Sequence, residues 1–103
     1  MMRQLFSVFD SKAQAFMTPF VEQSPGTSSR AFEAACNEQG HIFNAHPEDF
    51  TLFYIGDFDD ATASIETLKA PEAIAAAIAM VRQAETPLFD LTDAPQPKLE
   101  EVG

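Results

Sequence analysis

The sequence predicts a single α+β domain in which an antiparallel sheet of about four strands packs with two helices, in the order ββαββα. Three observations support this prediction. The chain has 103 residues, 46% of them hydrophobic, which suffices for one core without disulfides or metal ions. Short segments rich in phenylalanine and valine are bounded by turn residues, and two segments show a helical spacing of apolar residues. We expect residues 1–86 to form the domain and residues 87–103, which are acidic and contain prolines, to be a flexible tail.

The first two strands are predicted to form a hairpin. Gln4–Asp10 is rich in phenylalanine and valine, and the turn residues Asp10–Lys12 follow it. The extended, aromatic pattern resumes over Ala15–Val21. Pro19 has no amide proton to donate, so we expect the second strand to lie at an edge of the sheet or to pair poorly at that point.

The first helix is predicted to begin at a cap within Thr27–Ser29, because these hydroxyl residues accept hydrogen bonds from the first free amides of a helix. It is expected to run to about Glu38 and to be followed by Gly40 in a left-handed stop. The residues with helical spacing that should face the core are Phe32, Ala35 and Cys36.

The second half of the chain is predicted to repeat the pattern of two strands and a helix. Phe50–Ile55 is almost continuously apolar, which indicates a strand covered on both faces, or covered on one face and docked to a partner on the other. A turn at Asp59–Thr62 leads into a strand over Ser64–Leu68. Pro71 then suits the first turn of a second helix that ends near Ala84. The apolar stripe of that helix consists of Ile74, Ala77, Ile78 and Val81.

The charge balance excludes the usual footprint of a duplex-binding domain. Sixteen acidic residues stand against six lysines and arginines, which gives a net charge of −10, whereas nucleic-acid-binding domains are typically basic. The single cysteine, Cys36, cannot form an internal disulfide and suits a reducing compartment. No apolar run approaches a membrane span, and the N-terminal segment reaches an acid at Asp10, unlike a signal peptide. We therefore expect a cytoplasmic protein.

Two blocks of sequence resemble a family of phage proteins. The first is Leu5–Ala13, which reads LFSVFDSKA, and the second is His46–Phe53 with Gly56–Thr62, which read HPEDFTLF and GDFDDAT. They resemble the small nonstructural protein of microviruses, the tailless single-stranded DNA phages, in particular the gokushovirus type. The resemblance covers roughly residues 5–82. One departure is Ala63, where a glycine is expected after the turn, so this hairpin is expected to use a turn without a left-handed residue there.

The resemblance implies a non-enzymatic accessory protein of a phage, acting in the cytoplasm of the infected bacterium. Such proteins are commonly labelled DNA-binding, and they are likened to the small factor that switches replication from duplex copies to packaged single strands. No nucleotide-binding loop, nucleophile elbow or paired histidine–glutamate motif is present in the sequence, which agrees with a protein that is not an enzyme and needs no cofactor.

Two clusters of polar residues are candidate metal sites. Asp57, Asp59 and Asp60 offer oxygen ligands of the kind that Mg²⁺ prefers, but three acids within four residues are also typical of a hairpin turn, which is the interpretation we favour. Cys36, His41 and His46 follow one another at five-residue intervals, and the acids Glu48 and Asp49 come closely after them. Zinc sites usually space four committed ligands more closely, so we favour a core cysteine and two loop histidines, and expect no metal.

The block His46, Pro47, Glu48 and Asp49 has no assigned chemistry. Pro47 restricts the backbone, and an adjacent acid is suited to cap exposed amides. We interpret the block as a fixed loop that leads into the apolar strand at Phe50.

If the protein binds DNA, single strands are the expected ligand, because aromatic stacking then replaces many phosphate contacts. The candidate residues for such binding are Arg3, Lys12, Arg30 and Lys69. We expect them to gather at one end of the fold beside helix N-termini, with Asp57, Asp59 and Asp60 lying elsewhere, and we expect binding that weakens steeply with salt.

Two other functions remain open from the sequence. One is an acidic protein–protein adaptor that docks a replication initiator, a host factor or the procapsid without touching DNA. The other is an acidic decoy that mimics DNA and occupies a basic host protein. A two-sided apolar strand at Phe50–Ile55 also predicts a homodimer, because two helices cover a sheet incompletely.

Overall fold

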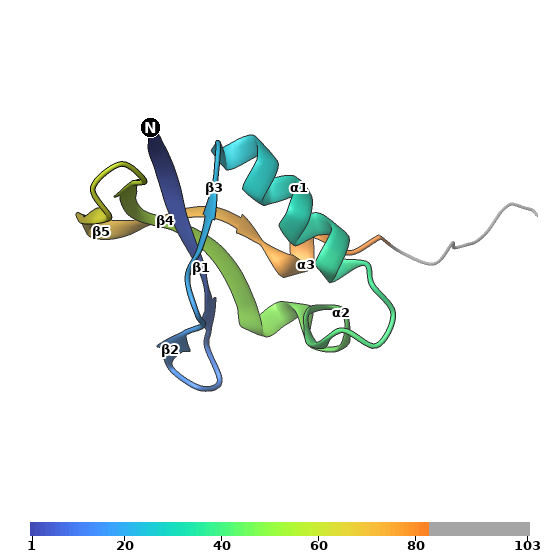
Figure 1. The fold of residues 1–103 in the computed structure, drawn as a ribbon. Coiled ribbons are helices and arrows are strands. Elements are labelled where there is room, and N and C mark those ends of the chain that lie inside the picture. Colours follow the sequence, from blue (N-terminus) through green and yellow to red (C-terminus); the bar gives the residue numbers. More distant parts are fainter. Residues whose placement is uncertain (83–103) are drawn as a thin grey trace, which may run out of the picture.

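The computed structural model describes residues 1–82, which form an α+β fold around one strongly curled antiparallel sheet (Figure 1). The predicted fold class is therefore confirmed, although the order of elements differs from ββαββα. The elements are β1 (Met2–Asp10), β2 (Ala15–Phe16), β3 (Phe20–Glu22), α1 (Pro25–Cys36), α2 (Ile42–Ala45), the 3-10 turn η1 (Pro47–Asp49), β4 (Phe50–Asp59), β5 (Ser64–Ala76) and α3 (Ala77–Met80). No helix within residues 1–82 has the length and apolar character needed to cross a bilayer.

β1 is the central strand of the sheet. Its partners on one side are β2 and β3, and on the other side it pairs with β4, which in turn pairs with β5. The predicted second strand is thus divided in two, and Pro19 lies in the break. At the break, the Met17 amide donates to the Val8 carbonyl over 2.8 Å, and the Ser7 hydroxyl donates to the Met17 carbonyl over 2.6 Å. The expectation that pairing fails around Pro19 is confirmed.

The second predicted helix is largely wrong. The segment that follows Pro71 continues as strand β5 to Ala76, and only Ala77–Met80 forms a helical turn. Ten residues of β4 require a hydrogen-bonding partner, and β5 supplies it as far as the pair Thr51 and Ala76. Residues 68–71 bulge out opposite Ile55, so Pro71 sits where the ladder needs no donor. The predicted end of the helix near Ala84 and the tail at residues 87–103 lie outside the described residues.

The first helix begins earlier than predicted. Ser24 is its N-cap, with its hydroxyl accepting from the Thr27 amide, while the Thr27 hydroxyl accepts from the Ser24 amide. Pro25 occupies the first turn, where a missing amide proton costs nothing. The helix ends at Cys36, and Gly40, with a φ of 91°, lies in the following turn instead of capping it directly. Thr27–Ser29 therefore lie inside the helix.

The core lies between the sheet and the helices. Phe6 and Leu52 of the two central strands are fully buried, and Phe32 of α1 and Phe43 of α2 pack ring to ring at 5.4 Å. Other members are Val8, Cys36, Phe50 and Ala77. Ile78, predicted to face inward, is 60% exposed, because the chain at this point is a single helical turn and not a long helix.

Two hairpin loops, at opposite ends of the sheet, have the same construction. Asp10 accepts from the amides of its loop, and its carbonyl accepts from Gln14 over 2.8 Å; Asp59 does the same for its loop, with Ala63 bonded over 2.7 Å. Gln14 and Ala63 both have a left-handed backbone, with φ of 59° and 64°. The expectation of a different turn at Ala63 is therefore wrong, and alanine there bears the steric cost that glycine avoids.

Candidate nucleic-acid interface

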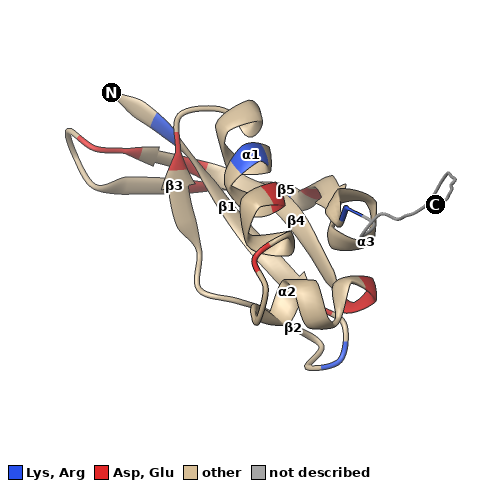
Figure 2. Cartoon of the chain, turned by 90° about the vertical axis from the view of Figure 1, so that its right-hand side faces the viewer, with Lys and Arg blue, Asp and Glu red and all other residues tan. Residues whose placement is uncertain are grey.

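The basic residues predicted to gather are separated in the structure. Arg3 lies near the start of β1, whereas Lys12 follows its far end, and a nine-residue strand is about 30 Å long. Arg30 is exposed on α1, and Lys69 lies in the bulge of β5 at the outer edge of the sheet. In Figure 2 the basic segments accordingly lie apart from one another. The predicted four-residue cluster does not form.

The acids of the β4–β5 loop lie beside a cation instead of away from one. Asp60 accepts from Arg3 Nε over 3.2 Å and from the N-terminal ammonium over 2.7 Å. The ammonium and then Arg3 hold the pKa of Asp60 below its usual range. Asp59 bonds the Ala61 amide of its own turn, and Asp57 accepts from the Tyr54 hydroxyl over 2.7 Å. The expectation that these three acids stand clear of the predicted cations is wrong.

Within residues 1–82, the helices lie on one side of the sheet and no described element covers the opposite side (Figure 1). Three phenylalanines from three strands meet on that side, namely Phe9, Phe16 and Phe53. Their ring centroids are 5.0 to 6.4 Å apart and the rings meet edge to face. Phe16 is 44% exposed. We call this side the uncovered face; by strand register the residues that also lie on it are Arg3, Leu5, Ser7, Val21, Thr51, Gly56, Phe58, Ile65, Thr67 and Ala73. Leu5 and Ser7 are nevertheless buried.

The acids of the strands avoid the uncovered face. Side chains alternate between the two faces of a sheet, and the pairing of Gln4 with Glu22 and Asp57 places these two acids on the helix side. The hydrogen bond from Tyr54 to Asp57 supports this placement of Asp57, because Tyr54 packs against the core on the helix side of the sheet. The strand acids that share this side are Asp10, Glu22, Asp57, Asp59, Glu66 and Glu72. Although the chain has a net charge of −10, the strand residues on the uncovered face include no acid, and Arg3 is the charged residue among them.

The sequence carried the signal for the uncovered face. With the break at Ile55 taken into account, the acids of β1 and β4 fall in phase with core residues such as Phe6 and Phe50, while Phe9, Phe53 and Phe58 fall in the other phase. Of the two alternatives that the sequence left for Phe50–Ile55, the helices of residues 1–82 cover one face, and a partner docked on the other face stays a prediction. Sequence reasoning missed the meeting of Phe9, Phe16 and Phe53, because it depends on the register of three strands.

The cysteine and histidines weighed as a zinc site have separate roles. Cys36 is fully buried, and burial raises the pKa of its thiol to about 11. His41 caps α2, with Nδ1 accepting from the Phe43 amide over 3.0 Å, and its ring lies 4.5 Å from that of Phe43. His46 lies beyond α2, next to Glu48 and Asp49 in η1.

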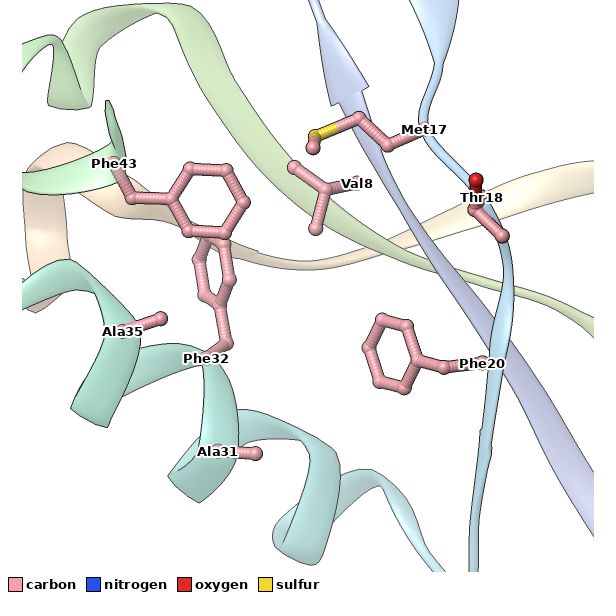
Figure 3. A pocket seen from close by; sticks show the side chains of 8 residues that line it. All are labelled: Val8, Met17, Thr18, Phe20, Ala31, Phe32, Ala35 and Phe43. Atoms are coloured by element: carbon pink, nitrogen blue, oxygen red, sulfur yellow. The ribbon is translucent and has the colours of Figure 1, made fainter. Parts of the chain in front are cut away.

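An apolar crevice of about 230 Å³ opens between α1 and the first strands (Figure 3). Phe20 and Phe32 face it from opposite sides, and Met17 lies at its rim. Its remaining lining consists of Val8, Thr18, Ala31, Ala35 and Phe43. Because the only polar side chain among these is a threonine hydroxyl, the crevice offers no group for acid–base or metal chemistry.

Comparison with known protein families gives a match over most of the chain. The family model described as Phage ORF5 protein matches residues 3–80, which is most of the chain and nearly all of the described fold. No curated protein and no solved structure matches the chain. Both motif blocks and, apart from Met2, all residues of the strands that build the uncovered face fall within the matched region. The chain belongs to the Phage ORF5 protein family and is a small phage protein.

Proposed function

We propose that this phage accessory protein binds single-stranded DNA on the uncovered face during viral DNA replication or packaging, in the cytoplasm of the infected bacterium. The resemblance to the gokushovirus type of microvirus supports this setting. The observation that carries the proposal is the segregation of strand acids from the face on which Phe9, Phe16 and Phe53 meet. A polyanion can approach this side of an acidic protein without meeting strand carboxylates.

Base stacking supplies the binding energy in this proposal. Unpaired bases stack on aromatic side chains with little preference for sequence, and each stacked base contributes about 1–3 kcal/mol. Phe16 presents the most exposed ring of the cluster, at 44%. Duplex DNA hides its bases, so the same face offers little to a double strand.

Phosphate contacts make only a small contribution, because few cations flank the cluster. Lys12 lies in the loop that joins the strands carrying Phe9 and Phe16, whereas Arg3 lies on the uncovered face six residues along β1 from Phe9 and is paired with Asp60. One or two phosphate contacts to a single strand give a slope of log K against log salt of about −0.7 to −1.4. The expectation of steep salt dependence is thus replaced by a shallow one.

Fluorescence anisotropy of the full chain with a labelled oligothymidine and with a matched duplex tests the proposal at several salt concentrations. Phe16→Ala should weaken single-strand binding about 5- to 150-fold and leave the salt slope unchanged. Ile78→Ala, which truncates an apolar side chain of 60% exposure on α3, is the matched control and should bind as the parent does. Equal affinity of Phe16→Ala and the parent, or absence of single-strand binding at low salt, refutes the proposal.

A protein–protein adaptor is the second candidate, and the edge-to-face packing of the three rings favours it. Rings packed edge to face already make favourable contacts with one another, and they present an apolar surface instead of parallel planes on which bases could stack. Such a surface suits a replication initiator, a host factor, a procapsid protein or a second copy of this chain. Failure to bind oligonucleotides together with loss of partner capture in Phe16→Ala would support the adaptor; light scattering would identify a homodimer.

A further inference from the structure

A groove of about 420 Å³ separates the β1–β2 loop from the α2–η1 segment, away from the uncovered face. Its polar lining comes from Asp10 and Lys12 on one side and from His46, Glu48 and Asp49 on the other. Ile42 and Phe50 form its apolar part. The proposed DNA interface uses none of the three residues on the second side.

The backbone holds the second side of the groove in place. Pro47 opens η1, the Asp49 amide donates to the His46 carbonyl over 3.1 Å, and the His46 amide donates to Ile42 over 2.9 Å. The β1–β2 loop closes on this turn, because the Ser11 amide donates to the Asp49 carbonyl over 2.9 Å. Phe50, 3% exposed and packed against Phe43 with the ring centroids 4.7 Å apart and the rings tilted, anchors the end of the turn in the core.

Three side chains converge on this fixed turn. One imidazole nitrogen of His46 and one oxygen each of Glu48 and Asp49 lie within 4.8 Å of one another. Within residues 1–82, none of these side chains forms a hydrogen bond or ion pair, and Lys12 pairs with no carboxylate. The ligands of a tetrahedral zinc ion stand about 3.3 Å apart when its bonds are near 2.0 Å. Small rotations of exposed side chains bring the three groups to that spacing.

We propose that His46, Glu48 and Asp49 bind a divalent transition-metal ion at the mouth of this groove. An imidazole suits zinc, copper, iron and nickel, and two carboxylates suit harder ions such as manganese, so the mixed set fits zinc or manganese best. Three protein ligands leave a position for water or an anionic oxygen. Asp10 lies outside the group of ligand atoms within 4.8 Å of one another, and its Oδ1 accepts from the Lys12 and Ala13 amides of its own loop.

Calorimetric titration of the full chain with zinc chloride and manganese chloride tests this site. Saturable binding of one ion is expected, and His46→Ala and the isosteric Glu48→Gln should each weaken it at least about tenfold, because even the loss of an outer-shell partner costs metal sites that much. Lys12→Gln should strengthen binding severalfold, since it removes a positive charge from the groove. Glu38→Gln, an exposed acid outside the groove, is the matched control and should bind as the parent does.

Histidine NMR spectra keep the test independent of any change in stability. The chain has two histidines, and the ion should shift the ring signals of His46 while those of His41, the α2 cap, stay in place. No saturable binding of either ion, unchanged affinity in both His46→Ala and Glu48→Gln, or a shift confined to His41 would overturn the site.

Discussion

Replacing Gly56 by alanine tests whether the sheet needs a bare backbone at this point. Gly56 lies in β4 between Leu5 of β1 and Thr67 of β5. A Cβ atom there would stand 2.4 Å from the Glu66 carbonyl oxygen and 2.9 Å from Thr67 Cα. Both atoms belong to the backbone, so rotation of a side chain cannot relieve the contact. The glycine is required for space, not for an unusual backbone angle.

The cost of the substitution follows from that geometry. Ordinary carbon–oxygen contacts are about 3.3–3.6 Å, so β4 and β5 must separate by roughly 1 Å at this point. One or two ladder hydrogen bonds, at about 0.5–1.5 kcal/mol each, are then lost along with strand packing. Alanine recovers about 0.5–1 kcal/mol of chain entropy relative to glycine. The net loss is about 2 kcal/mol, which lowers the melting temperature of a domain this size by about 8–16 °C.

Thermal and urea unfolding followed by circular dichroism measure this loss. Gly26→Ala is the matched control, because a Cβ at position 26 meets only Ser24 Oγ, at an ordinary 3.7 Å, and the residue lies in α1. The control should be neutral or slightly stabilising. A Gly56→Ala protein that melts within a degree or two of the parent would refute the close approach of β4 and β5.

Three further predictions concern single side chains. Ala63→Gly should stabilise the fold by up to about 1 kcal/mol in urea unfolding, because it relieves a left-handed alanine; no gain would contradict the loop geometry. The absorbance titration of Tyr54, the only tyrosine in the chain, should have a midpoint above the usual pKa near 10, because the Tyr54 hydroxyl donates a hydrogen bond to Asp57. Asp57→Asn should lower this midpoint. A midpoint at the usual pKa in the parent would show that the hydrogen bond is absent. The Cys36 thiol, with its pKa raised to about 11, should react slowly with thiol reagents at pH 8, and its contribution to stability should disappear as pH rises from about 9 through 11; rapid labelling of the native protein would contradict its burial.

Local patterns predicted most of the first half of the fold. The phenylalanine and valine run of β1 and the apolar run of β4 specify strands on their own, and Pro19 marked the break between β2 and β3. The segment after Pro71 could not be predicted in the same way. Its alanines favour a helix, but the long β4 strand needs a second partner, and that tertiary demand decides the outcome. A short stretch of sequence does not show this competition between helix propensity and pairing with a distant strand.

The candidate interface was predicted less well than the fold. Arg3 and Lys12 stand nine positions apart in sequence, and a strand converts that separation into opposite ends of the sheet. The acids followed a rule that the sequence does contain, since alternation along each strand assigns them to one face. The net charge of the whole chain argued against DNA binding, whereas in the structure the acids of the strands lie on the helix side of the sheet and not on the uncovered face.

The central position of β1 bears on the order in which this protein can fold. β1 is made first, and β2 and β3 can close its first edge soon afterwards, because they follow within about a dozen residues. Its second edge stays open until β4, some fifty residues later, has left the ribosome. Long-range pairing of this kind slows folding, and an open apolar edge invites association with other unfinished chains. A nascent chain truncated before residue 50 should therefore aggregate, and the arrival of β4 together with β5, which covers the other edge of β4, should make it monodisperse.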